Sequence, residues 1–359
     1  MATIANKNVA SLFFLANVLA MLAPRLCGAA VPALFILGDS TADVGTNSFL
    51  ANSHARANFP ANGIDFPNSR ATGRFSNGFN SADYIAKLMG FRRSPQPFLY
   101  LVTIKSGLQK RKFRGVNFAS GGAGILDITG QDLIVVPLSE QIKQFATVRS
   151  NLTVVMGPKG TASFLSKSVF SISIGSNDIF GHFATNSTVP KKQFISVLMT
   201  AYESYIKSLY SLGARKFGII SVPPVGCCPS QRIFNSTGGC LEIQNDFSRS
   251  FHSELSILMS KISSDLPALK YSIGNTYEMT MNVIENHLLF GLKDVETACC
   301  GSGTQTCTPA ASFCSNRNEY LFWDLYHPTQ GASFLAAQVL YIGDKRFVSP
   351  INFYELAEY

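Results

Sequence analysis

Five short runs of apolar and β-branched residues divide the chain, and each has the length of a β-strand. The runs are Ala33–Leu37, Gly115–Phe118, Val169–Ile174, Phe217–Val222 and Lys270–Ile273. The first is apolar at every position, as expected of a strand whose two faces are both covered. Such strands belong to parallel sheets, so the pattern predicts a parallel sheet buried between other layers.

The intervals between these runs carry apolar residues at every third or fourth position, which is typical of helices with one face in a core. The clearest stripes are Phe194–Leu212 before Gly213, Phe247–Ile262 before Pro267, and Ser81–Met89 before Gly90. The glycine or proline after each stripe is a usual helix stop. Strands that alternate with helices predict an α/β fold with helices on both faces of the sheet. No repeat or long linker interrupts residues 31–359, so we expect a single domain there.

The first 30 residues have the features of a secretory signal peptide. Lys7 precedes an apolar stretch, Val9–Ala23, and small residues follow at Gly28, Ala29 and Ala30. The apolar stretch is shorter than the roughly 20 residues of a membrane-spanning helix. We therefore predict cleavage near Ala29 or Ala30, a secreted, extracellular mature chain, and no transmembrane anchor.

Composition narrows the class of protein. The chain is 46% hydrophobic and 14% charged, which excludes a disordered or charge-rich scaffold. Its formal net charge of +8 falls to +6 once the signal, with Lys7 and Arg25, is removed. The one basic run, Lys105–Arg114, is interpreted as a solvated loop that suits an anionic polysaccharide surface. We expect no nucleic-acid partner.

Cysteine usage agrees with an oxidising compartment. Of eight cysteines, Cys27 leaves with the signal, and no CxxC pair or neighbouring histidine pair indicates a zinc site. We therefore predict disulfides and no metal. The seven remaining cysteines allow three bridges and one free thiol. One bridge should join Cys227 or Cys228 to Cys240 and the others should lie within Cys299–Cys314, while the identity of the free cysteine stays open.

Three Asn-x-Ser/Thr sequons remain in the predicted mature chain, at Asn151, Asn186 and Asn235. Each lies in a polar stretch that reads as a loop, where a glycan can be carried without burial. The sequons predict a glycoprotein.

Candidate chemistry follows the predicted strands, because ligands of open α/β sheets bind beyond the carboxyl ends of the strands. The sequence GDST begins at Gly38 after the first strand, SGGAG begins at Ser120 after the second, and GSND begins at Gly175 after the third. Near the C-terminus, Asp324 precedes His327 by three residues. The glycine-rich segment lacks the spacing of a dinucleotide-binding loop, so no cofactor is predicted.

Taken together, these segments form a hydrolase site. We expect Ser40 on a strand-to-helix turn with its hydroxyl at the edge of the sheet. The spacing of Asp324 and His327, close to one helical turn, lets the carboxylate hold one imidazole nitrogen while the other faces Ser40. The backbone N–H groups of Ser40 and Gly121 and the side-chain amide of Asn177 are candidate oxyanion donors.

With these residues in this order, the chain resembles the secreted plant type of GDSL esterase/lipases, the SGNH hydrolases. The resemblance runs from about Leu34 to the C-terminal helix, and further matching motifs are GRFSNG at 73–78, PPVGC at 223–227 and CCG at 299–301. It implies a flavodoxin-like, three-layer α/β/α fold. It also implies the residue roles: Ser40 as nucleophile, Gly121 and Asn177 as oxyanion residues, and Asp324 with His327 as the other triad members.

The chain departs from the family pattern at two positions. Thr41 replaces the leucine of the family name, and Thr46 replaces the first asparagine of the usual DxGNN. Neither change removes a catalytic group, so they bear on substrate fit and not on the mechanism.

The sequence thus favours a secreted serine esterase or lipase that hydrolyses carboxylic esters, of lipid or small-molecule type. An acyltransferase would use the same residues, and a binding protein on a hydrolase fold is a third interpretation. The third would be expected to lack Ser40, Asn177 or His327, and all are present. Lipid esters and acetyl esters of wall polysaccharides both remain open as substrates.

Overall fold

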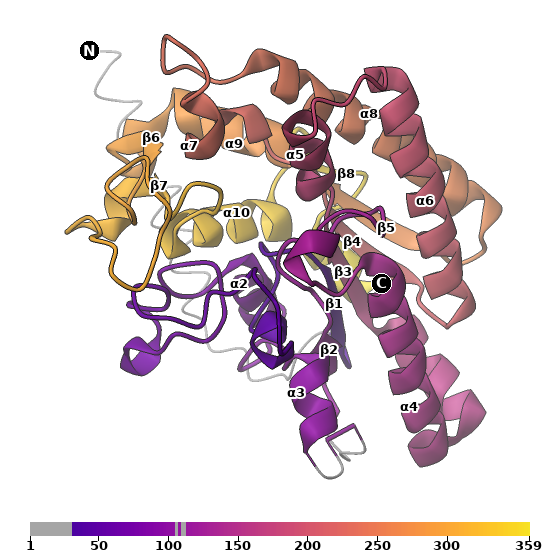
Figure 1. The fold of residues 1–359 in the computed structure, drawn as a ribbon. Helices are drawn as coiled ribbons and strands as arrows, with labels where there is room; N and C mark the ends of the chain where they lie inside the picture. The colour runs from indigo at the N-terminus through magenta and orange to yellow at the C-terminus, as the bar shows by residue number, and fades with distance from the viewer. Residues whose placement is uncertain (1–30, 105–106, 109–112) are drawn as a thin grey trace, which may run out of the picture.

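The structure, a computed structural model, describes residues 31–104, 107–108 and 113–359 (Figure 1). Its centre is a six-stranded sheet in the order β2-β1-β3-β4-β5-β8, parallel except for β8. The strands are β1 (Leu34–Gly38), β2 (Gly115–Asn117), β3 (Val169–Ser173), β4 (Lys216–Ile220), β5 (Lys270–Gly274) and β8 (Val348–Ser349). The five predicted strands are confirmed to within two residues. Their order, 2-1-3-4-5, is that of the flavodoxin-like fold and confirms the predicted fold class.

The register of the central strands brings their carboxyl ends to one edge. In β1, Leu34 pairs with Gly115 of β2 on one side and with Val169 of β3 on the other. The residues after the three strands therefore emerge side by side, as expected for a parallel sheet.

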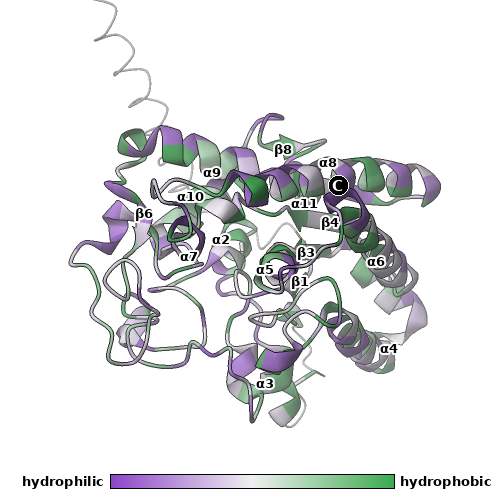
Figure 2. Cartoon of the chain, turned by 45° about the horizontal axis from the view of Figure 1, so that its top comes forward, coloured by the Kyte–Doolittle hydropathy of each residue, from purple (hydrophilic) through white to green (hydrophobic). Residues whose placement is uncertain are grey.

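Side chains of β1 alternate between two cores. Phe35 and Leu37 belong to the core under α4, α6 and α8, whereas Leu34 and Ile36 belong to the core under α2, α10 and α11. The helices are α4 (Leu138–Lys167), α6 (Lys191–Ser211), α8 (Glu242–Asp265), α2 (Ser81–Leu88), α10 (Gln330–Ile342) and α11 (Phe353–Glu358). Figure 1 shows the first three helices on one side of the sheet. Figure 2 shows hydrophobic and hydrophilic residues mixed along each of them, as amphipathic layers require.

The three predicted helices correspond to α6, α8 and α2 and are confirmed. Helix α4 was not predicted. It breaks at Gly157, whose φ of +71° is outside the helical range, and the next residue is Pro158, which has no N–H to donate. This break divides the apolar stripe and weakens its helical signal in the sequence.

A small parallel sheet of β6 (Asp294–Ala298) and β7 (Tyr320–Phe322) lies outside the main one and leads into the segment with Asp324 and His327. The shorter helices are α3 (Phe98–Thr103), α5 (Ser176–Ala184), α7 (Pro229–Arg232) and α9 (Thr276–Glu285). Helix α5 follows β3 directly and therefore begins at the carboxyl edge of the sheet.

Two sequence predictions concern residues outside the described ranges. The predicted signal peptide, residues 1–30, and most of the basic run Lys105–Arg114 lie outside the described residues. Within the described ranges, no helix combines the length and apolar character that a membrane crossing requires. Asn186 and Asn235 lie in turns, as expected. The prediction of a loop at Asn151 is wrong, because this residue lies in α4, although its side chain is not buried.

Candidate active site

Ser40 lies in a single tight turn immediately after β1. The N–H groups of Ala42 and Asp43 both donate to the carbonyl of Asp39, at 3.2 and 3.0 Å, and close this turn. Gly38 precedes it with φ of +147°, and a side chain there would collide with the carbonyl of Ser173 in the neighbouring strand. The chain continues into a loop and a short 3-10 helix from Thr46, not directly into the α-helix expected. The turn leaves Ser40 9% exposed.

The histidine and aspartate of the site share one loop between β7 and α10. His327 Nε2 lies 2.7 Å from Ser40 Oγ, and His327 Nδ1 lies 2.8 Å from Asp324 Oδ2. The loop is not helical, so the expected helical spacing is wrong in its geometry. Instead, Asp324 Oδ1 accepts the backbone N–H groups of Tyr326 and His327, at 2.9 and 2.8 Å, and folds the loop back on itself. The predicted contacts among Ser40, His327 and Asp324 are present.

The environment of His327 suits a base that is held by a carboxylate. Burial lowers the pKa of the imidazole, but the charge and hydrogen bond of Asp324, together with the charge of Asp39, outweigh this and raise it above its usual value. Burial also raises the pKa of Asp39 to about 6, against hydrogen bonds from the N–H and hydroxyl of Thr41. The negative charges near the ring favour the imidazolium that forms when a proton is taken from Ser40.

The sequence motif at 73–78 contacts the histidine loop and the start of α10. The ring of Phe75 lies 5.0 Å from the ring of His327, measured between centroids. Asn77 Oδ1 accepts the backbone N–H of Gln330, at 2.7 Å, where α10 begins. The motif therefore fixes the position of the loop that carries the imidazole.

Asn177 lies at the start of α5, beside Ser40, and its placement depends on the loop after β2. Its side-chain Nδ2 donates one hydrogen to the carbonyl of Ala123 at 2.9 Å, which leaves a second hydrogen for a ligand. The next residue, Asp178, is 2% exposed and accepts the N–H groups of Ile125 and Leu126, at 2.8 and 3.1 Å. Burial raises the pKa of Asp178 to about 6. This carboxylate ties the loop to α5 and so orients the amide of Asn177.

Gly121 is placed differently from the expectation. Its N–H donates to Asp43 Oδ2 at 3.0 Å, and Asp43 is fully buried. The same carboxylate accepts the N–H groups of Gly45 and Thr46, and burial raises its pKa to about 6. An oxyanion could use the N–H of Gly121 only by sharing or displacing Asp43. None of the described residues accepts a hydrogen bond from the N–H of Ser40.

Sequence reasoning did not assign a role to Asp43 or Asp178. Each lies a few residues beyond a strand, where an aspartate is usually a turn residue. The available signal is the glycine-rich segment nearby, whose many N–H groups require acceptors when the segment is buried.

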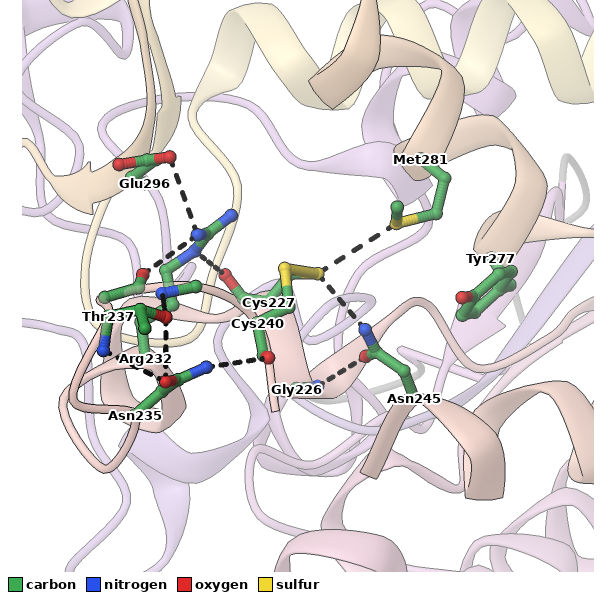
Figure 3. Close-up of a disulfide and its surroundings, with 12 residues drawn as sticks. Gly226, Cys227, Arg232, Asn235, Thr237, Cys240, Asn245, Tyr277, Met281 and Glu296 are labelled. Carbon is green, nitrogen blue, oxygen red and sulfur yellow. Dashed lines mark hydrogen bonds and ion pairs between the residues drawn. A yellow bond between two sulfur atoms is a disulfide. The ribbon is translucent and has the colours of Figure 1, made fainter. Parts of the chain in front are cut away.

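The predicted disulfides are confirmed. The bridges are Cys227–Cys240, Cys299–Cys314 and Cys300–Cys307, and Cys228 is free and buried. Figure 3 shows the Cys227–Cys240 bridge beside Arg232, a residue that is only 7% exposed. The Arg232 guanidinium donates to the carbonyl of Cys227 at 2.9 Å and pairs with Glu296 of β6 at 3.6 Å. The bridge closes this segment on itself, and the ion pair of Arg232 connects it to the small sheet.

The same segment supports the histidine loop from behind. The N–H of Ser230 donates to the carbonyl of Leu325 at 3.0 Å, and the thiol of Cys228 lies 3.8 Å from the carbonyl of Tyr326. Burial raises the pKa of the Cys228 thiol to about 12, so it is a packing group and not a nucleophile.

A cavity of about 2050 Å³ opens over Ser40, Asn177 and His327. Much of its wall is apolar, with Leu126, Ile128, Phe180, Met279, Val283 and Val339 among the lining residues. In the parts of the chain that the structure describes, no group of three or more histidine, cysteine or carboxylate side chains could hold a metal ion.

A flavodoxin-like sheet with a serine, a histidine and an aspartate linked in this way at its carboxyl edge is the arrangement of the α/β serine hydrolases. Comparison with known proteins agrees. The model of the GDSL-like lipase/acylhydrolase family matches residues 34–340.

Several GDSL esterase/lipases of Arabidopsis thaliana are similar to the chain along most of both lengths. One is 36% identical over 345 residues, which cover 91% of this chain and 90% of the relative. A second is 36% identical over 337 residues, with 90% and 88% covered, and a third is 33% identical over 349 residues, with 92% and 89% covered. The chain belongs to the GDSL lipase/acylhydrolase family, a family of carboxylic ester hydrolases.

Proposed function

We propose that this protein hydrolyses carboxylic esters with Ser40 as nucleophile, His327 as general base and Asp324 as the group that orients the imidazole. The observation that carries the proposal is the continuous chain of contacts from Ser40 Oγ to His327 Nε2, 2.7 Å, and from His327 Nδ1 to Asp324, 2.8 Å. A base must lie within hydrogen-bond reach of the proton that it takes, and His327 does.

The proposed reaction has two halves. Ser40 Oγ attacks the ester carbonyl while His327 takes the hydroxyl proton, and the carbonyl oxygen becomes an oxyanion that receives hydrogen bonds from Asn177 and the N–H of Ser40. The C–O bond to the alcohol then breaks, and His327 returns the proton to the departing alcohol oxygen. In the second half His327 takes a proton from water, the hydroxide adds to the acyl carbonyl, and Ser40 leaves with the proton restored. The products are one carboxylic acid and one alcohol.

Gly121 remains part of this proposal as the third oxyanion donor. Its N–H would have to turn from Asp43 toward the substrate oxygen, or be shared between the two. Asp43 Oδ1 holds the N–H groups of Gly45 and Thr46, so the carboxylate stays anchored through this oxygen if Oδ2 releases the N–H of Gly121.

Labelling with a serine-directed fluorophosphonate tests the assignment of the nucleophile. The probe is expected to modify Ser40, and peptide mapping by mass spectrometry identifies the site. Ser40→Ala should remove both the label and the hydrolysis of p-nitrophenyl butyrate. Ser176→Ala, which changes another serine that lines the cavity, is the matched control and should keep the label. Labelling at another serine, or none in folded protein, would contradict the proposal.

We further propose that residues 31–359 form one secreted, glycosylated hydrolase domain. The signal-like N-terminus, the three sequons and the three disulfides support this location. Expression in a eukaryotic host should release a protein whose first residue is Ala30 or Val31, as read by N-terminal sequencing. Peptide N-glycosidase should lower its mass if Asn151, Asn186 or Asn235 carries a glycan. Retention in the cytosol would refute the proposal.

A further inference from the structure

Helix α5 lines the active-site cavity from Asn177 onward, with Phe180 and the two small residues Gly181 and Ala184 among its lining positions. Gly181 follows Asn177 by four positions and Ala184 follows it by seven, so the three residues share one face of the helix. All three line the same cavity as Ser40. From Asn177 to Ala184 the helix rises about 10 Å. Ala184 is exposed, so this face leads from the oxyanion amide to solvent.

Gly181 is not required by the backbone or by packing. Its φ does not lie in the left-handed region, and a Cβ built at this position meets no atom within 4 Å. Glycine inside a helix weakens it relative to alanine, because glycine loses more conformational freedom on folding. What the absence of a side chain at Gly181 preserves is open space in the cavity, one helical turn from Asn177.

The loop after β2 lines the same cavity with apolar and polar residues. Leu126 and Ile128 are lining residues, with Ile128 71% exposed, and Gln131 and Asp132 line the cavity as well. Asp178 accepts the N–H of Leu126 and the hydroxyl of Thr129, at 3.1 and 2.8 Å, so this loop is held to the start of α5. The side chains of Leu126 and Ile128 offer hydrocarbon contacts to a ligand in the cavity.

We propose that the lane along α5, formed by Asn177, Gly181, Ala184, Leu126 and Ile128, binds the acyl chain of a medium- or long-chain fatty acyl ester, and that Gly181 keeps it open. The inference rests on the proposed ester hydrolysis and names its substrate class. The cavity, at about 2050 Å³, exceeds the roughly 300–1,000 Å³ of ordinary small-molecule sites. An acetyl group would leave the lane empty.

The proposal places the acyl chain, and not the alcohol, in the lane. His327 must return a proton to the alcohol oxygen, so the alcohol lies toward His327. The lane begins at Asn177, which receives the carbonyl oxygen in this proposal, and is left for the acyl chain.

A graded set of substitutions at Gly181 tests the proposal. The assay is kcat/KM for p-nitrophenyl acetate, octanoate and palmitate, which share one alcohol and differ in acyl length. A methylene that leaves water in the transition state changes kcat/KM by about fourfold, so wild type should prefer octanoate to acetate by at least about tenfold. The ratio of octanoate to acetate should fall in the order Gly181→Ala, Gly181→Leu, Gly181→Phe, and by about tenfold or more for Phe.

Two controls separate a blocked lane from general damage. Gly160→Phe places the same side chain on the exposed surface of α4 and should leave the ratio and both rates unchanged. Gly181→Ala should raise Tm, because alanine favours the helix, even as the ratio begins to fall. If Gly181→Phe does not fold, Gly181→Leu carries the same test.

Three results would contradict the binding of the acyl chain along α5, and a fourth would contradict the proposed ester hydrolysis. The lane is wrong if wild type prefers acetate, if Gly181→Phe leaves the octanoate-to-acetate ratio unchanged, or if it lowers both rates equally. In each of these cases fluorophosphonate labelling of Ser40 shows that the catalytic site still works. Absence of both labelling and hydrolysis in wild type refutes the proposed function instead.

Discussion

Replacement of Asp324 by asparagine should disable the base without unfolding its loop. Both oxygens of Asp324 lie 2.8 Å from His327 Nδ1, and Oδ1 also accepts the two backbone N–H groups of Tyr326 and His327. In Asp324→Asn the amide oxygen keeps the two backbone hydrogen bonds, because only an acceptor fits there. The amide NH₂ then takes the place of Oδ2 and points a hydrogen at His327 Nδ1.

The expected loss follows from the tautomer. The amide oxygen already accepts two backbone N–H groups, which use both of its lone pairs, so Nδ1 becomes the acceptor of the amide hydrogen. The proton of the neutral ring then moves to Nε2, the nitrogen that faces Ser40 at 2.7 Å. A protonated Nε2 cannot take the serine proton. Reversal of the tautomer in a triad costs about 10⁴ in kcat, or about 5 kcal/mol in the activation free energy. Because the loop hydrogen bonds survive, Tm should fall by no more than about 4 °C.

The pH dependence supplies a second readout. His327 must be neutral to act as a base, so kcat/KM falls as pH drops through the pKa of the imidazole, which Asp324 and Asp39 hold above its usual value. Without the charge of Asp324, burial becomes the stronger influence and the acid limb of residual activity should move to lower pH. The assay is hydrolysis of p-nitrophenyl butyrate, with Tm measured on the same preparation. Asp265→Asn, at the exposed end of α8, is the control and should behave as wild type.

The reasoning fails if folded Asp324→Asn retains more than about a tenth of wild-type kcat, or if its acid limb moves to higher pH. A large drop in Tm with normal kcat per folded molecule would show that Asp324 holds the loop and does not orient the base.

Three further predictions concern neighbouring groups. Asn177→Ala should lower kcat by about 10²–10³ with little change in KM, because an oxyanion donor acts mainly in the transition state; near-normal kcat with a lowered Tm would contradict this role. Asp178→Asn should lower kcat by about tenfold, because the amide offers one acceptor oxygen to donors that the carboxylate now holds with two, and an unchanged kcat would show that the loop after β2 does not orient Asn177. Thiol titration of the unreduced mature protein should detect no fast-reacting group when native and one after denaturation, from Cys228, whereas seven groups would refute the disulfides.

Much of the fold could be read from the sequence because strand burial leaves a direct pattern. The strand Leu34–Gly38 is covered on both faces and is apolar throughout, and the other central strands are apolar at most positions. The edge strand Val348–Ser349 has two residues, too few for any pattern. The small sheet is also hard to predict, because Asp294–Ala298 buries only Val295 and Ala298, without the alternation of a half-buried strand, and its pairing is irregular.

The candidate site, like the fold, could be predicted only in part from the sequence. Ser40, Asn177 and His327 could be found because each occupies a position that parallel strands or a short spacing must bring to one edge. The sequence did not predict which buried polar groups form hydrogen bonds with one another. The carboxylate of Asp43 takes the N–H of Gly121, and that of Asp178 holds the loop beside Asn177. Such pairings depend on three-dimensional proximity across 50 or more residues, and a local pattern does not contain it.

The disulfides support one part of the candidate site, the histidine loop, and not the other part, the turn that carries Ser40. Ser40 stands on the sheet, and β1, β2 and β3 contain no cysteine. The histidine loop instead follows Phe322 and Trp323, whose carbonyls accept the N–H groups of the bridged Cys299 and Cys300 at 3.0 and 2.7 Å. The position of His327 therefore depends on the disulfides, whereas the turn that carries Ser40 does not. Reduction of the bridges should loosen the histidine loop before it disturbs the turn at Ser40.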